Sequence, residues 1–83
     1  MADVTYYVAL PFQQDETGEP VAGAAEELQS LNAAIRRADT LSRSPGVVGA
    51  VAFSRTGDPA IGEFGDAVVL RKFGDVPDDL SGL

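Results

Sequence analysis

One segment of this chain has the apolar period of a helix, whereas the segments on both sides of it alternate as strands do. The apolar stripe of the helical segment consists of Leu31, Ala34, Ile35, Ala38 and Leu41. Ser30 is suited to cap the first turn, and Pro45 cannot continue a helix, so we expect a helix over 31–43. A single short helix covers only one face of a sheet, and this limits how the chain can bury its apolar residues.

Three segments have the character of strands. Residues 4–12 alternate with period two, which predicts a strand with one well-buried face. Residues 47–55 are apolar on both faces, as in an interior strand. Residues 66–73, with Ala67-Val68-Val69-Leu70 at their centre, form the expected last strand.

Residues 21–28 fit two structures, and the sequence leaves the choice open. A polar turn at 15–18 favours a hairpin whose return arm would be 21–28, but Ala22, Ala25 and Leu28 also fit a helical period. We therefore expect a single α+β domain over 1–83. It is a two-layer sandwich in the order strand, strand, helix, strand, strand, with one helix on a mainly antiparallel sheet of three to four strands. Residues 75–83 are expected to form a flexible acidic tail.

Composition excludes several classes of site. The chain of 83 residues has no cysteine and no histidine, so disulfides and Cys/His zinc sites are excluded. Its formal charge of −7 opposes binding to nucleic acid or to an anionic membrane surface. We see no targeting segment, so we expect a cytoplasmic protein. We see no cofactor-binding motif either, so we expect no cofactor.

A face left uncovered by the helix is the main functional expectation. We expect the helix to pack on the bulky side chains of the two central strands, such as Leu10, Val51 and Phe53. The opposite face would then be apolar, flat and exposed, and a large exposed apolar patch usually marks an interface. We expect this face to bind a second copy of the chain. Its residues are Thr5, Tyr7, Ala9, Val48, Ala50, Ala52 and Ser54.

Catalytic chemistry is not indicated. A nucleophile needs an adjacent base, and no motif places one beside Ser54 or Thr56. We therefore expect a protein that is not an enzyme, with no catalytic and no cofactor-binding residues. The loop over 57–65 is the one candidate ligand site, although its acidic residues are more simply explained as turn residues than as metal ligands. The residues of this candidate site are Arg55, Asp58, Glu63, Phe64 and Asp66.

A group of residues in the second half of the chain carries a resemblance that extends over nearly the whole chain. The residues that carry the likeness are Gly49–Pro59, Gly62, Asp66–Leu70 and Phe73–Pro77. In this pattern the chain resembles a family of short uncharacterised bacterial proteins, over about Tyr6 to Pro77. The resemblance implies no activity and brings no functional residue with it. In strand order alone, the chain is also similar to antitoxin domains of the HicB type.

Two functions follow from these observations. The first is a non-enzymatic protein–protein interaction module, homodimeric through the uncovered sheet face or bound to another protein. The alternative is a protein that binds a small ligand or metal through the 57–65 loop.

Overall fold

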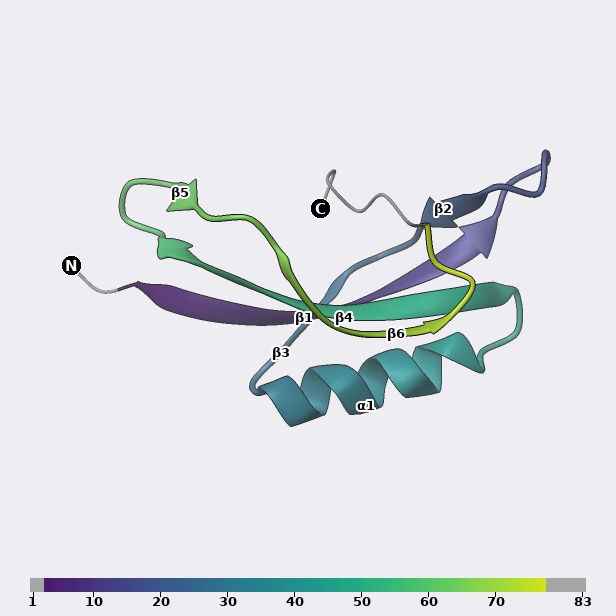
Figure 1. Ribbon diagram of the computed structural model, residues 1–83, viewed down its shortest axis with the longest axis horizontal. Coiled ribbons are helices and arrows are strands. Elements are labelled where there is room, and N and C mark those ends of the chain that lie inside the picture. Colours follow the sequence, from purple (N-terminus) through teal and green to yellow (C-terminus); the bar gives the residue numbers. More distant parts are fainter. Residues whose placement is uncertain (1–2, 78–83) are drawn as a thin grey trace.

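The computed structural model describes residues 3–77 and confirms an α+β fold with one helix and a curled antiparallel sheet (Figure 1). Two long neighbouring strands, β1 (Val4–Gln14) and β4 (Val47–Asp58), form the centre of the sheet, and α1 (Leu31–Ser42) packs on it. The outer strands are β2 (Pro20–Ala22) and β3 (Glu26–Leu28) beside β1, and β5 (Glu63–Phe64) and β6 (Val68–Gly74) beside β4. Every pairing is antiparallel.

The segment 21–28 forms strands, which settles the choice that the sequence left open. It is divided into β2 and β3, and both pair with β1. Between them the Gly23 N–H donates to the Pro11 carbonyl at 2.8 Å, so the chain stays beside β1 through the interruption. With β5 as a further short strand, the sheet formed by residues 3–77 has six strands rather than three to four. Short edge strands of two or three residues carry too little periodicity to be recognised in a sequence.

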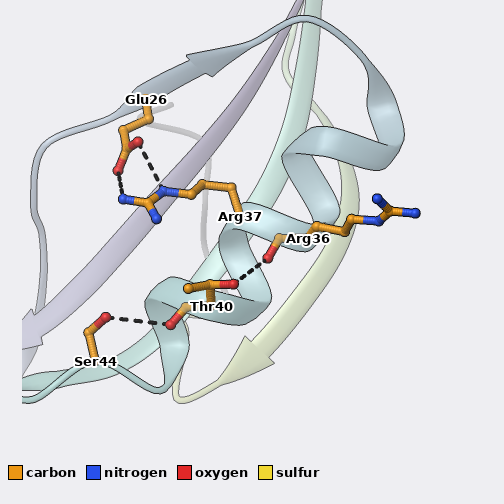
Figure 2. A network of polar contacts seen from close by, with 5 residues as sticks. All are labelled: Glu26, Arg36, Arg37, Thr40 and Ser44. Atoms are coloured by element: carbon orange, nitrogen blue, oxygen red, sulfur yellow. Dashed lines mark hydrogen bonds and ion pairs between the residues drawn. The ribbon is translucent and has the colours of Figure 1, made fainter.

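Helix α1 begins and ends where the sequence indicates. The Ser30 side chain accepts a hydrogen bond from the Ala33 N–H at 3.1 Å, which satisfies one of the free donors of the first turn. Figure 2 shows the contact that ties the helix to β3, in which Arg37 donates to Glu26 through Nε at 3.0 Å and Nη2 at 2.9 Å. Further along α1, the Thr40 hydroxyl donates to the Arg36 carbonyl (Figure 2).

The helix packs on the face of the sheet that carries small side chains, and this corrects the sequence prediction. We call this the alanine face. Its buried core joins the helix to both central strands and consists of Ala9, Ala34, Ala38, Leu41, Ala50 and Ala52. Tyr7 packs against the same cluster. Small residues on both partners allow the helix axis to approach the sheet closely, which a face of Phe and Leu would prevent.

The seven residues predicted as an open interface therefore do not form one uncovered face. Ala9, Ala50 and Ala52 are completely buried, beneath the helix. Val48 belongs to the opposite side, because a register shift between Phe12 and Gln13 places it as an extra residue in β4. The remaining members, Thr5, Tyr7 and Ser54, range from exposed to partly buried.

The opposite face, which we call the bulky face, buries its large side chains without a helix. Its core is Leu10, Phe12, Val51 and Phe53, with Val8, Val48, Ala67 and Val76 packed against it. In Figure 1 both ends of the sheet rise on the side away from α1, with β5 at one end and β2 at the other. This curvature makes the bulky face concave, so its side chains bury one another.

Two glycines of β4 allow the chain to cross the bulky face. A Cβ on Gly49 would lie 2.6 Å from the Asp75 carbonyl carbon, so only glycine admits the Asp75 backbone there. The Asp75 N–H donates to the Val48 carbonyl at 2.9 Å. A Cβ on Gly57 would likewise lie 2.6 Å from the Phe64 Cα.

The predicted flexible tail (75–83) is described only in part. Its first three residues lie within the described structure, and Val76 packs against the core of the bulky face. The rest of that prediction lies outside the described residues.

The turn between β1 and β2 is held by one carboxylate. Asp15 accepts hydrogen bonds from the Thr17 hydroxyl at 2.6 Å, from the Thr17 N–H at 2.8 Å and from the Glu19 N–H at 3.0 Å. These bonds, the Thr17 hydroxyl first, hold the pKa of Asp15 below its ordinary value of 3.8. A lowered folded-state pKa means that the ionised form favours the turn. The support is therefore complete above the unfolded pKa, and it is lost as the pH falls through the lowered pKa.

Candidate functional site

A groove of about 500 Å³ lies on the bulky face, between β3 and the β4–β5 hairpin. We call it the Arg55 groove. It is lined by Tyr6, Val8, Ala25, Glu27, Phe53, Arg55 and Phe64. This volume falls within the usual range for small-molecule sites, and the lining is mainly apolar with two charged groups, as such sites commonly are.

The register of the sheet explains why these residues meet. Tyr6 of β1 lies opposite Arg55 of β4, and two residues further along Val8 lies opposite Phe53. Residues directly opposite each other in an antiparallel pair project from the same face. On the other side of β1, Val8 lies opposite Glu27 of β3. The floor of the groove is therefore the row formed by Glu27 of β3, Val8 of β1 and Phe53 of β4. Tyr6 and Arg55 lie beside this row.

Phe64 forms one wall of the groove. Its ring centroid lies 5.6 Å from that of Tyr6 with the planes tilted by 51°, which is a favourable arrangement for two aromatic rings. The close approach of β5 to Gly57 brings the Phe64 ring next to Tyr6. Phe64 stays 41% exposed, so its ring presents an apolar surface to the open side of the groove.

Arg55 is the most unusual side chain of the groove. Its Nε is buried and makes no hydrogen bond with a described residue. The two ion pairs found between described residues, Arg37–Glu26 and Arg43–Asp39, do not involve Arg55. A buried donor without an acceptor costs about 1–3 kcal/mol. An anion in the groove would bind the outer nitrogens of the guanidinium, which form no ion pair with an acidic side chain of the described residues.

The predicted ligand residues are divided between two pockets. Arg55 and Phe64 line the Arg55 groove, whereas Asp58, Glu63 and Phe64 line a second pocket of about 630 Å³ beside Asp3. Asp66 lines neither of them. No three acidic side chains within residues 3–77 lie close enough together to hold a metal ion. Asp58 instead accepts the Ala60 N–H at 2.9 Å, which is the turn role that the sequence also allowed.

Five groove residues are not among the predicted ligand residues: Tyr6, Val8, Ala25, Glu27 and Phe53. Tyr6, Val8 and Phe53 lie on the bulky face, which the sequence prediction places under the helix. Glu27 gave no signal because the structure of 21–28 was open, and only its pairing opposite Val8 places it in the groove.

Comparison of the chain with protein-family models, with curated proteins and with solved structures gave no match. The family resemblance expected from the sequence therefore stays a prediction. Within residues 3–77, no helix is both long enough and apolar enough to span a bilayer.

Proposed function

We propose that this chain is a non-enzymatic binding protein whose Arg55 groove holds a small molecule with an apolar body and an anionic group. One observation carries the proposal: the guanidinium of Arg55 has no ion-pair partner among the described residues, and it lines a pocket whose other side chains are mainly apolar. Of the two functions expected from the sequence, the geometry supports ligand binding better, because α1 covers the core of the predicted interface.

The chemistry of the groove supports an anion with an apolar body. A guanidinium binds a carboxylate or phosphate through two parallel hydrogen bonds, and these are strong because both partners are charged. The rings of Tyr6, Phe53 and Phe64 supply apolar area for the remainder of the ligand. No histidine or cysteine is present to act as an activated nucleophile or as a base near neutral pH, which supports binding rather than catalysis.

The test compares two probes of one shape, 3-phenylpropanoate and the uncharged 3-phenylpropanol, by isothermal titration calorimetry. We expect the carboxylate to bind at least tenfold more tightly than the alcohol. Arg55→Gln should remove this preference while leaving the thermal unfolding midpoint of the protein nearly unchanged. Arg71→Gln is the matched control, because Arg71 is an exposed arginine on β6 outside the groove. The Arg71→Gln variant should bind 3-phenylpropanoate with the affinity of the wild type. Absence of binding to the wild type at millimolar probe would overturn the proposal.

A homodimer is the second candidate, and the outer edge of β6 favours it. Within residues 3–77, β6 pairs only with β4, and two large apolar side chains on it are exposed, Val68 by 59% and Val69 by 39%. Exposed apolar edge strands tend to pair with another chain. We propose that two copies join along β6. Sedimentation equilibrium should then give twice the chain mass, and Val68→Lys should return it to one chain mass; a single-chain mass for the wild type would exclude the dimer.

A further inference from the structure

Glu27 is the second charged residue of the Arg55 groove, and its neighbour shows why it faces the groove. Glu26 pairs with Arg37 of α1 and therefore projects toward the helix side of the sheet. Successive side chains of a strand project to opposite faces, so Glu27 projects to the bulky face. It lines the groove, and no ion pair with a described residue engages it.

The two charges lie on either side of one apolar floor. Glu27 is opposite Val8, Val8 is opposite Phe53, and Arg55 lies two residues further along β4. Two strand spacings and two residue rises separate the Cα atoms of Glu27 and Arg55 by about 12 Å. The groove therefore presents a carboxylate and a guanidinium on opposite sides of an apolar floor.

This pair of charges favours a ligand that carries both charges over one that is only anionic. The chain carries a net charge of −7, and Glu27 adds a negative charge inside the groove itself, so both offset part of the attraction between Arg55 and a ligand that is only anionic. A ligand with an ammonium group close to its carboxylate meets an opposite charge at each end. Complementary charges of this kind mainly determine which ligand is accepted.

We propose that the ligand of the Arg55 groove is a small zwitterion of the α-amino acid type with an apolar side chain. Its carboxylate binds Arg55 and its ammonium group binds Glu27. Its side chain packs against the rings of Tyr6, Phe53 and Phe64. This inference rests on the proposed function, because it adds an ammonium site to the same groove.

Three probes that share a phenyl ring test the inference: L-phenylalanine, 3-phenylpropanoate, which lacks the amine, and phenethylamine, which lacks the carboxylate. Titration calorimetry at neutral pH gives each dissociation constant. We expect L-phenylalanine to bind the wild type at least tenfold more tightly than either of the other two. Glu27→Gln should reduce its affinity to that of 3-phenylpropanoate, and it should not weaken 3-phenylpropanoate. Glu26→Gln is the matched control because it removes the adjacent carboxylate on the helix side, and it should leave the three affinities in the same order.

Each outcome separates the inference from the function on which it rests. The proposal of a zwitterionic ligand is wrong if 3-phenylpropanoate binds as tightly as L-phenylalanine, or if Glu27→Gln lowers the affinities of both probes to the same extent. In either case the anion site at Arg55 stands. If phenethylamine binds as tightly as L-phenylalanine and Arg55→Gln has no effect, the anion site is wrong as well. If none of the three binds, both proposals fall. Circular dichroism of Glu27→Gln, which changes an exposed residue, checks that its fold is retained.

Discussion

Replacing Ala9 by glutamate is expected to unfold this protein. Ala9 has no exposed surface and lies in the cluster that joins β1 and β4 to α1. A carboxylate there has no cationic partner, and leaving an uncompensated charge buried costs about 3–5 kcal/mol. A domain of this size has only a few kcal/mol of net stability, so the variant should lose its cooperative unfolding transition by circular dichroism.

The matched control is Val4→Glu, which adds the same charge on the same strand at a residue that is 38% exposed. It should change the free energy of unfolding by less than about 1 kcal/mol. The comparison also tests the placement of the helix. If α1 lay on the bulky face, Ala9 would face solvent, and the two variants would then be equally stable.

Gly49→Ala is the second substitution with a large expected effect. The added Cβ would lie 2.6 Å from both the carbonyl carbon and the amide nitrogen of Asp75, and these are backbone atoms that cannot rotate away. The Asp75 segment would have to move, which breaks its hydrogen bond to Val48 and uncovers the side of the core that Val76 covers. We expect a loss of about 2–4 kcal/mol in the free energy of unfolding, measured by urea denaturation.

Gly65→Ala provides the comparison for a glycine with room for a side chain. Its Cβ would lie 3.6 Å from the Thr56 carbonyl oxygen, which is ordinary van der Waals contact. Its free energy of unfolding should stay within about 0.5 kcal/mol of the wild type. Equal stabilities for the two variants would mean that the chain after Gly74 does not cross the sheet at Gly49.

Local patterns in the sequence predict most of the elements but not the way they assemble. The period of residues 31–43 and the Ser30 cap locate α1, because helix spacing and capping are properties of neighbouring residues. Alternation likewise identifies β1 and β4. Which face of the sheet receives the helix depends instead on how closely two surfaces can approach. The sequence prediction places the helix over the largest side chains, whereas the curl of the sheet buries Val51 completely and Phe53 to 7% exposure.

The candidate site was predicted only in part for the same reason. Arg55 and Phe64 are candidates from the sequence because Arg55 lies at the mouth of the turn-rich loop over 57–65 and Phe64 lies within it. Their meeting with Tyr6 and Glu27 depends on the registers of β1 with β4 and with β3, which join residues far apart in the chain. The shift that moves Val48 to the bulky face is a further feature of register that alternation in the sequence does not reveal.

The account depends on a binding groove at Arg55, on the side of the sheet away from α1. The most direct test is a titration of ¹⁵N-labelled protein with 3-phenylpropanoate, followed through the backbone amide shifts. The account predicts saturable shifts centred on Tyr6, Val8, Phe53, Arg55 and Phe64, with the amides of Ala34 and Ala38 unmoved, and the loss of these shifts in Arg55→Gln. Shifts that are largest along α1, or a spectrum that the carboxylate leaves unchanged at millimolar concentration, would contradict it.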